Sequence, residues 1–232
     1  MKSFFFLVFF LSLSFQANSS SGAQQQKEQS IFLGNEFISQ HSEKPISTPS
    51  GLVSHKKILN KLKAGGLVIY FRHATTERDY ADQADPKMNL RDCDTQRRIS
   101  LQGIKESYVI GTVFAEKKIP VGNVIASEYC RAWKTANFAF GRVDEKDSRL
   151  NFLPYEEYTM DLISLMKTNI TPMLSKPPSP GTNTVIVGHD DPFEAATGIY
   201  PEPQGIAYII KPIKGTSFRI ITKLLPREWQ EL

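Results

Sequence analysis

The sequence predicts a three-layer α/β/α sandwich with a mostly parallel central sheet. Short apolar runs rich in β-branched residues alternate along the chain with longer segments whose apolar residues recur at helical spacing. The short runs are continuously apolar, which is typical of strands buried on both faces of a parallel sheet. Strands that alternate with helices in this way favour helices packed on both faces of one sheet.

The predicted elements follow one another in a regular order. A helix begins at Ser54 and ends at Gly65-Gly66, because glycines commonly end helices. Strands are predicted at residues 67–71, 124–126 and 184–187, with a closing hairpin of residues 207–210 and 218–221 around Lys214-Gly215. A helix capped by Ser100, a helix over residues 129–140 and a long helix before the proline-rich residues 177–181 complete the set. The apolar side is predicted to consist of Leu101, Ile104, Tyr108 and Ala115 in the first of these helices, and of Leu162, Leu165, Met166 and Met173 in the last.

The first 23 residues have the layout of a cleavable secretory signal peptide. Lys2 provides a short basic start, residues 4–15 are almost purely apolar, and Ser21-Gly22-Ala23 offers a site for cleavage before Gln24. The apolar run is about a dozen residues long, whereas a membrane-spanning helix needs about 20. We therefore expect a periplasmic or secreted protein with no stable membrane insertion after cleavage near Ala23. The alternative is an uncleaved N-terminal anchor.

The remaining chain is expected to form one domain. Residues 24–52 are rich in Gln, Ser, Glu and Lys and are expected to be poorly ordered, whereas residues 53–232 are long enough for a single buried core. Residues 1–23 contain one Lys and no other charged residue, so their removal lowers the formal charge from +4 to +3. This slight basic excess, without a basic stripe, gives no indication of nucleic-acid binding. The sequence does not indicate an oligomeric state.

Three predicted strands end in residues that can carry chemistry. The first runs into Arg72-His73, the second into residues 127–131, which end with Arg131, and the third into His189-Asp190. A single histidine after a strand is more often a hydrogen-bonded loop residue than a catalyst. In open α/β sheets, however, ligands bind beyond the carboxyl ends of the strands, so these residues are expected to meet at one edge.

Such a group of residues suits phosphoryl transfer. Guanidinium groups match the geometry of phosphate oxygens, and a helix that begins near Tyr129 would direct its free N–H groups at the same point. A neutral imidazole, with its pKa held low by cationic neighbours, can attack phosphorus, and a second histidine can stabilise the equatorial oxygens. The scheme needs no metal or other cofactor, and the sequence has no Asp/His cluster at the usual ligand spacings.

Four stretches occur in a specific order: Phe71-Arg72-His73-Ala74, residues 93–103, residues 126–136 and Val187-Gly188-His189. They resemble the motifs of the histidine phosphatase superfamily, which includes phosphoglycerate mutases and histidine acid phosphatases. The likeness covers roughly residues 66–222, and Ala74 replaces the family's usual glycine. The resemblance implies a phosphoglycerate mutase-like fold and no cofactor. It also implies a phosphate pocket of Arg72, Arg131, His73 and His189 in which His73 is the nucleophile.

The resemblance leaves the acid that protonates the leaving group open. Glu156, with Glu157 beside it, lies at the spacing found in the mutase-like branch. Asp190 directly follows the second histidine, as the acid does in the acid-phosphatase branch. Asp94 is a third candidate. Any of them must be held protonated by burial or by nearby negative charge in order to act as an acid.

Export favours hydrolysis of an extracytoplasmic phosphomonoester, either a small molecule or a glycan, such as a sugar phosphate of the lipopolysaccharide core. One alternative is a phosphotransferase of the phosphoglycerate mutase type, although the substrates of such enzymes are cytosolic. Others are a non-catalytic module of the same fold that binds phosphorylated ligands, and a purely structural exported protein.

Two cysteines, Cys93 and Cys130, lie beside the predicted motifs. In an exported protein an even pair can form a disulfide. The alternative is two separate buried thiols, because the sequence does not give the Cα–Cα distance that a disulfide requires.

Overall fold

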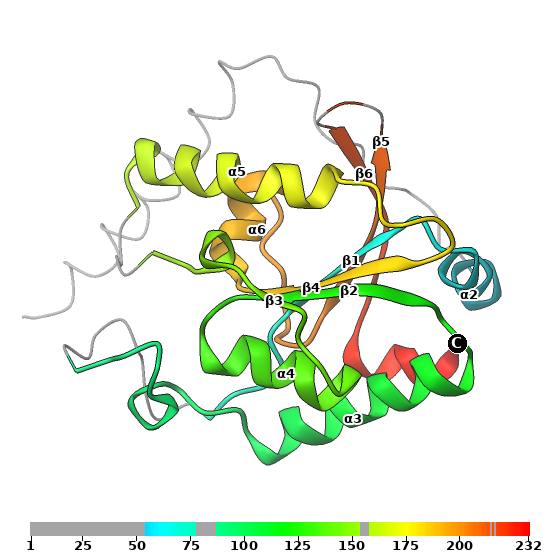
Figure 1. Cartoon of the computed structure of the whole chain (residues 1–232), viewed down its shortest axis with the longest axis horizontal. Helices are drawn as coiled ribbons and strands as arrows, with labels where there is room; N and C mark the ends of the chain where they lie inside the picture. Colours follow the sequence, from blue (N-terminus) through cyan, green and yellow to red (C-terminus); the bar gives the residue numbers. More distant parts are fainter. Residues whose placement is uncertain (1–53, 78–86, 154–157, 214, 216) are drawn as a thin grey trace, which may run out of the picture. The chain divides into compact units, whose positions relative to one another are not determined.

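The computed structural model describes residues 54–77, 87–153, 158–213, 215 and 217–232 (Figure 1). The sheet of this part has six strands in the order β3-β2-β4-β1-β5-β6. Their bounds are Val68–Arg72 for β1, Val121–Ala126 for β2, Glu145–Lys146 for β3, Asn183–Gly188 for β4, Ala207–Ile213 for β5 and Ser217–Leu224 for β6. Strands β1 to β4 are parallel, and the hairpin β5–β6 adds two antiparallel strands beside β1.

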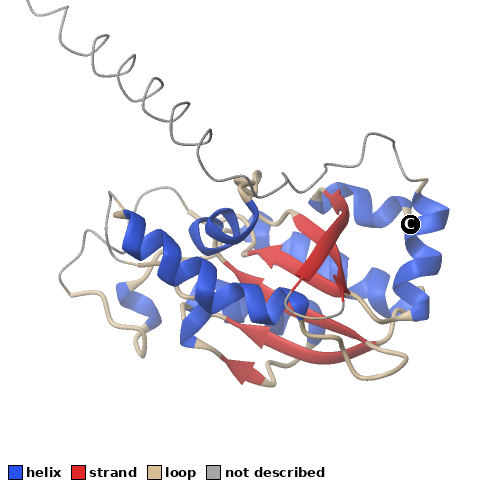
Figure 2. Cartoon of the chain, turned by 90° about the horizontal axis from the view of Figure 1, so that it is seen from above, coloured by secondary structure: helices blue, strands red, loops and turns tan. Residues whose placement is uncertain are grey.

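Helices cover both faces of this sheet. Helices α3 and α4 lie on one face, and α5 and α6 lie on the other (Figure 1). The view from above shows the red strands between blue helices (Figure 2). The α-helices are α2 (His55–Ala64), α3 (Leu101–Glu116), α4 (Cys130–Phe140), α5 (Met160–Ser175) and α6 (Asp190–Thr197), and the short 3-10 helices are η3 (Cys93–Thr95), η4 (Ser148–Leu150) and η5 (Pro226–Glu231).

Each face of the sheet has its own apolar cluster. Along β1, Ile69 and Phe71 pack in the cluster that contains buried residues of α3 and α4. Val68 and Tyr70 pack in the cluster that contains buried residues of α5 and α6. Because successive side chains of a strand point to opposite faces, full burial of β1 requires helices on both sides. The predicted three-layer α/β/α architecture with a mostly parallel sheet is confirmed.

The predicted apolar face of α3 is wrong. Leu101 and Tyr108 are 66% and 55% exposed. The buried side of the helix instead consists of Gly103, Ser107, Ile110, Val113 and Phe114. Small residues lie on this side because the helix approaches its neighbours closely: a Cβ at Gly103 would lie 2.2 Å from the Thr75 carbonyl oxygen. Hydrophobicity alone therefore selected the wrong side of the helix.

Helix α5 shows a smaller difference of the same kind. Leu165 was predicted on its apolar side and is 48% exposed, whereas Met166 and Met173 are buried as expected. The buried side also includes Ile170 and Leu174.

Among the helices that the structure describes, none combines the length and the apolar character that crossing a membrane requires.

The topology places several loops at the carboxyl edge of the parallel strands. Strand β1 lies between β4, which is parallel to it, and β5, which is antiparallel. The chain before β5 therefore enters the sheet at the edge where β1 ends. At the same edge, the Tyr70 hydroxyl donates a hydrogen bond of 2.6 Å to the His189 carbonyl. A Cβ at Gly188 would lie 2.3 Å from that hydroxyl oxygen, so glycine is required there.

Candidate active site

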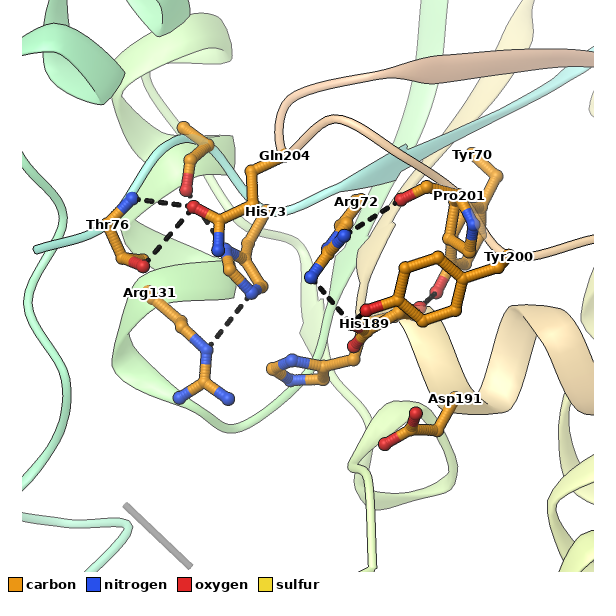
Figure 3. A network of polar contacts seen from close by, with 12 residues as sticks. Tyr70, Arg72, His73, Thr76, Arg131, His189, Asp191, Tyr200, Pro201 and Gln204 are labelled. Atoms are coloured by element: carbon orange, nitrogen blue, oxygen red, sulfur yellow. Dashed lines mark hydrogen bonds and ion pairs between the residues drawn. The ribbon is translucent and has the colours of Figure 1, made fainter. Parts of the chain in front are cut away.

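The ends of β1, β2 and β4 bring the four predicted phosphate ligands together (Figure 3). His73 and His189 are buried, and their ring centroids lie 5.3 Å apart. Arg131 is the second residue of α4, and Arg72 is the last residue of β1. Both arginines are also buried, with 2% and 7% of their surface exposed. Two buried guanidinium groups beside two buried imidazoles form a strongly cationic, partly dehydrated site.

The hydrogen bonds of His73 define which of its nitrogens can react. Its Nδ1 lies 2.9 Å from the carbonyl oxygen of Ala74. A carbonyl can only accept, so Nδ1 carries the proton and Nε2 presents a lone pair. The Arg131 Nε–H donates to this lone pair over 3.2 Å (Figure 3). The atom that would attack phosphorus therefore already faces a cation that could bind a phosphate oxygen.

The loop that carries His73 is held from two sides. The Ala74 N–H donates to the Thr135 hydroxyl over 3.0 Å, and that hydroxyl donates to the Arg131 carbonyl over 2.7 Å. The Ser100 hydroxyl donates to the Thr75 carbonyl over 3.0 Å. The start of α3 and the first turns of α4 thus fix the carbonyl that orients His73.

A chain of side chains orients His189. Its Nε2 lies 2.9 Å from the Ser127 hydroxyl oxygen, and that hydroxyl donates its single proton to Asn151 Oδ1 over 2.6 Å. The amide orientation of Asn151 is set by the Glu128 N–H, which donates to Oδ1, and by Glu128 Oε2, which accepts from Nδ2. Ser127 must therefore accept from His189, so Nε2 carries the proton of the neutral ring.

The other nitrogen of His189 is well placed for an anion. His189 Nδ1 is buried and has no hydrogen-bond partner among the residues that the structure describes, and the same is true of Arg72 Nε. Buried polar atoms are nearly always paired, so such atoms in a cationic site indicate a place for a ligand. Because Nε2 already carries a proton, Nδ1 can donate to an oxyanion only when the ring gains a second proton. An anion and a proton are thus expected to bind together.

Both histidines are held in the neutral form. Burial is the largest cause that lowers the pKa of His73 and of His189 well below the usual 6.5, and the charge of Arg131 is the second. The sequence prediction attributed this effect to the cationic neighbours alone. In the folded protein burial contributes more, because the rings lie within the structure rather than at an open edge.

These lowered pKa values predict a pH-dependent stability. Below pH 6.5 the unfolded chain binds protons at His73 and His189 that the folded protein does not bind, so the free energy of unfolding should fall as the pH falls. The slope should approach about 1.4 kcal/mol per pH unit for each histidine. Urea unfolding between pH 7 and pH 5.5 measures it. His189→Gln should show about half of the dependence, and an equal slope in that variant would contradict the assignment.

Asp190 is bound to Arg72. Its Oδ2 lies 2.5 Å from Arg72 Nη2 and accepts from the Tyr200 hydroxyl over 2.7 Å. Arg72 Nη1 donates to the Pro201 carbonyl over 3.0 Å, and the Tyr200 ring lies 5.3 Å from the guanidinium carbon (Figure 3). Asp190, which the sequence offered as the acid, therefore orients Arg72, one of the residues predicted to bind phosphate.

A second carboxylate, Asp191, was missed by the sequence analysis. Burial and the neighbouring charge of Asp190 raise its pKa, and the Tyr158 hydroxyl lies 2.8 Å from its Oδ2. The signal was present in the sequence, because two adjacent carboxylates after a histidine repel each other and favour the protonated form of one. Glu156 and Glu157 lie outside the described residues. Asp94 forms an exposed ion pair with Arg98.

Aromatic rings form one wall of the site. The Arg131 guanidinium carbon lies 4.9 Å from the ring centroid of Tyr129 and 5.0 Å from that of Phe152. The same two rings contact His189 edge-on, at 5.1 Å and 5.0 Å. They shield the Arg131 guanidinium and the His189 ring from water, which favours directed contacts with an oxyanion.

The N-terminus of α4 is less available than the sequence suggested. The Cys130 N–H donates to the buried side chain of Gln96 over 2.8 Å. Gln96 also donates to the Asn89 carbonyl, so it ties the segment before α3 to the start of α4. Cys93 and Cys130 form a disulfide with a Cα–Cα distance of 5.6 Å, which joins the same two parts of the chain.

No protein-family model and no curated protein matches this sequence. Solved structures do match the fold. The protein histidine phosphatase SixA, complexed with tungstate, is 13% identical over 70% of this chain and 98% of its own, with a TM-score of 0.51. An Escherichia coli protein assigned as an alpha-ribazole-5′-phosphate phosphatase is 13% identical over the same shares, with a TM-score of 0.52.

The matches agree with the α/β/α sandwich described above. The chain has the phosphoglycerate mutase-like fold, as the motifs predicted. At this level of identity the likeness concerns the fold alone, and function has to be argued from the site.

Proposed function

We propose that this protein is a phosphatase that hydrolyses phosphate monoesters through a phosphohistidine on His73. The observation that carries the proposal is the orientation of His73, whose Nδ1 is bound to a carbonyl and whose Nε2 lone pair faces Arg131. A nucleophile needs an unprotonated lone pair, a fixed direction and a cation beside the group that it attacks. All three are found at His73 Nε2.

In the first step, His73 Nε2 attacks phosphorus while the bond from phosphorus to the ester oxygen breaks. As the substrate enters, the Arg131 Nε–H would stop donating its hydrogen bond to His73 Nε2 and donate to a phosphate oxygen instead. Arg72 and protonated His189 bind the other oxygens, and their charges stabilise the transition state. The leaving alkoxide takes a proton from a carboxylic acid.

In the second step, water attacks the phosphohistidine. The bond between phosphorus and Nε2 breaks, inorganic phosphate leaves, and the proton lost by the water returns to the carboxylate. His73 thereby regains its neutral form with the proton on Nδ1, which donates to the Ala74 carbonyl. The Ser127 and Asn151 chain keeps His189 in place throughout both steps.

The substrate class we propose is a phosphomonoester of a small molecule or a glycan, including sugar phosphates of the lipopolysaccharide core. SixA is described as a protein histidine phosphatase and was solved with tungstate, a tetrahedral oxyanion that resembles phosphate. The alpha-ribazole-5′-phosphate phosphatase is named for a small phosphomonoester. Both names support phosphatase chemistry on this fold.

We further propose that the protein acts outside the cytoplasm. Residues 1–23 have the composition of a signal peptide. The disulfide between Cys93 and Cys130 supports this location, because disulfides persist in oxidising compartments and are rare in the cytosol. Fractionation of cells that express the full chain, followed by mass spectrometry of the mature N-terminus, tests both export and cleavage near Ala23.

Hydrolysis of p-nitrophenyl phosphate in the presence of a metal chelator tests the proposed activity, with His73→Ala as the control. Turnover by the wild type but not by His73→Ala supports a phosphatase. Tungstate binding without turnover would instead support a module that binds phosphorylated ligands. Transfer of the phosphoryl group to an added alcohol or sugar acid, with little release of phosphate, would support a mutase-type phosphotransferase.

The acid can be identified by comparing leaving groups. We expect Asp190→Asn to lower kcat/KM equally for p-nitrophenyl phosphate and for glycerol 2-phosphate, because Asp190 positions Arg72 and its loss weakens phosphate binding for both. The variant that lacks the true acid should lose about 10²- to 10⁴-fold on glycerol 2-phosphate only, since nitrophenolate leaves without a proton. Asp191→Asn and Glu156→Gln are the variants to compare. A selective loss in Asp190→Asn would show that Asp190 is the acid after all.

A further inference from the structure

A second pocket lies beside the candidate active site. It has a volume of about 260 Å³, and it shares Arg131 with the phosphate site. One wall comes from the segment before α3, with Arg97 and Arg98, and the other from α4, with Arg131 and Lys134. This volume is below the roughly 300–1,000 Å³ of sites that enclose a drug-sized ligand. The pocket therefore suits one chemical group of a larger substrate.

The charge of the pocket is strongly positive. Four cationic side chains line it, whereas Asp94 is its one carboxylate, and Asp94 already pairs with Arg98 at 3.1 Å. The charge of Arg97 also extends to the reaction centre, since it helps to lower the pKa of both His73 and His189. A cavity lined by charges of one sign concentrates ligands of the opposite sign.

The two walls are fastened to each other. The disulfide between Cys93 and Cys130 joins them covalently, and both cysteines line the pocket. The buried side chain of Gln96 adds a hydrogen bond of 2.8 Å to the Cys130 N–H. On α4, Arg131 and Lys134 are three residues apart and so lie on the same side of the helix. The two segments that carry the cationic side chains are thus held together, which reduces the backbone entropy lost on binding.

We propose that this pocket binds a second phosphate group of the substrate, so that the preferred substrates carry at least two phosphates. This inference rests on the proposed function, because Arg131 belongs to both sites. One phosphate reaches His73, and the other lies between Arg97 and Lys134. Arginine and lysine are the side chains that bind phosphate most strongly, and the apolar contacts of Ile99, Ile104 and Phe138 suit the carbon skeleton between the two groups.

The test compares the binding of fructose 6-phosphate with that of fructose 1,6-bisphosphate. Calorimetry on the full chain carrying His73→Ala removes turnover, so the result does not depend on whether the protein proves to be a phosphatase. We expect the bisphosphate to bind at least about 10-fold more tightly, and the preference to shrink as salt is added. Equal affinities for the two compounds would overturn the inference and leave the proposed function untouched.

Variants then locate the second phosphate. Adding Arg97→Gln and Lys134→Gln should weaken binding of the bisphosphate by about 10- to 150-fold, as expected for the loss of charge-assisted contacts, and so remove most of its preference over the monophosphate. Arg97→Lys with Lys134→Arg keeps the charges and should retain much of the preference, which guards against misfolding as the cause. Arg142→Gln, an exposed arginine paired with Asp144, is the matched control. A preference that survives in the double Gln variant would overturn the assignment of the pocket.

Discussion

Replacing His73 with Ala is expected to lower kcat for p-nitrophenyl phosphate by about 10⁴-fold or more. The loss is large because the variant has no nucleophile, and the remaining cationic groups can only bind the ester. Wild-type protein that is mixed with a labelled phosphoester and quenched in base should carry the label on His73, because phosphohistidine is lost in acid and survives in base. Stopped-flow kinetics should also show a burst of nitrophenolate if the second step is slower.

The matched control is His55→Ala. His55 is the first residue of α2 and lies 3.5 Å from Glu231 in a partly exposed contact, so its removal should leave kcat unchanged. If His73→Ala retains more than about a tenth of the wild-type kcat, the phosphohistidine mechanism is wrong. Water activated by another group would then be the nucleophile.

Arg131→Lys is expected to lower kcat/KM by about 10²- to 10³-fold even though the charge is kept. Three properties of Arg131 are lost with its guanidinium: the Nε–H that donates to His73 Nε2 over 3.2 Å, the planar fork for phosphate oxygens and the contacts with the rings of Tyr129 and Phe152. An ammonium group offers a point charge in place of a fork. Steady-state kinetics on p-nitrophenyl phosphate measure the loss.

Arg142→Lys serves as the control for this change, because Arg142 is about half exposed and pairs with Asp144 at the surface. It should retain wild-type kcat/KM. Thermal unfolding should be compared in parallel, since a buried arginine contributes to packing as well as to charge. A loss of less than about 5-fold in a folded Arg131→Lys variant would mean that Arg131 supplies charge alone.

The part of the site that could be predicted from the sequence is the part that strand ends determine. Arg72, His73 and His189 lie within two residues of the end of an apolar run, and Arg131 lies in the first turn of the helix that follows another such run. One topological rule sends all of these positions to the same edge of the sheet. The same rule gave the fold class, because continuous apolar runs alternate with helices.

Other site residues depend on contacts between distant parts of the chain. Ser127 and Asn151 are 24 residues apart, and nothing in either local pattern indicates that they together fix the proton of His189. The partner of Asp190 could not be predicted either, because Arg72 precedes it by 118 residues. The face of α3 was misjudged for a related reason: the close approach of Gly103 to the Thr75 carbonyl is a property of two packed segments.

The bridge between Cys93 and Cys130 has a consequence for the unfolded chain. It closes a loop of 37 residues that contains all of α3 and β2, so the oxidised chain can never spread these elements fully apart. In the loop-entropy description, a ring of that size lowers the entropy of the unfolded chain and so raises its free energy by about 4 kcal/mol. A chain oxidised in this way samples fewer conformations before it folds, and the two segments that form the walls of the pocket are joined to each other before the pocket exists.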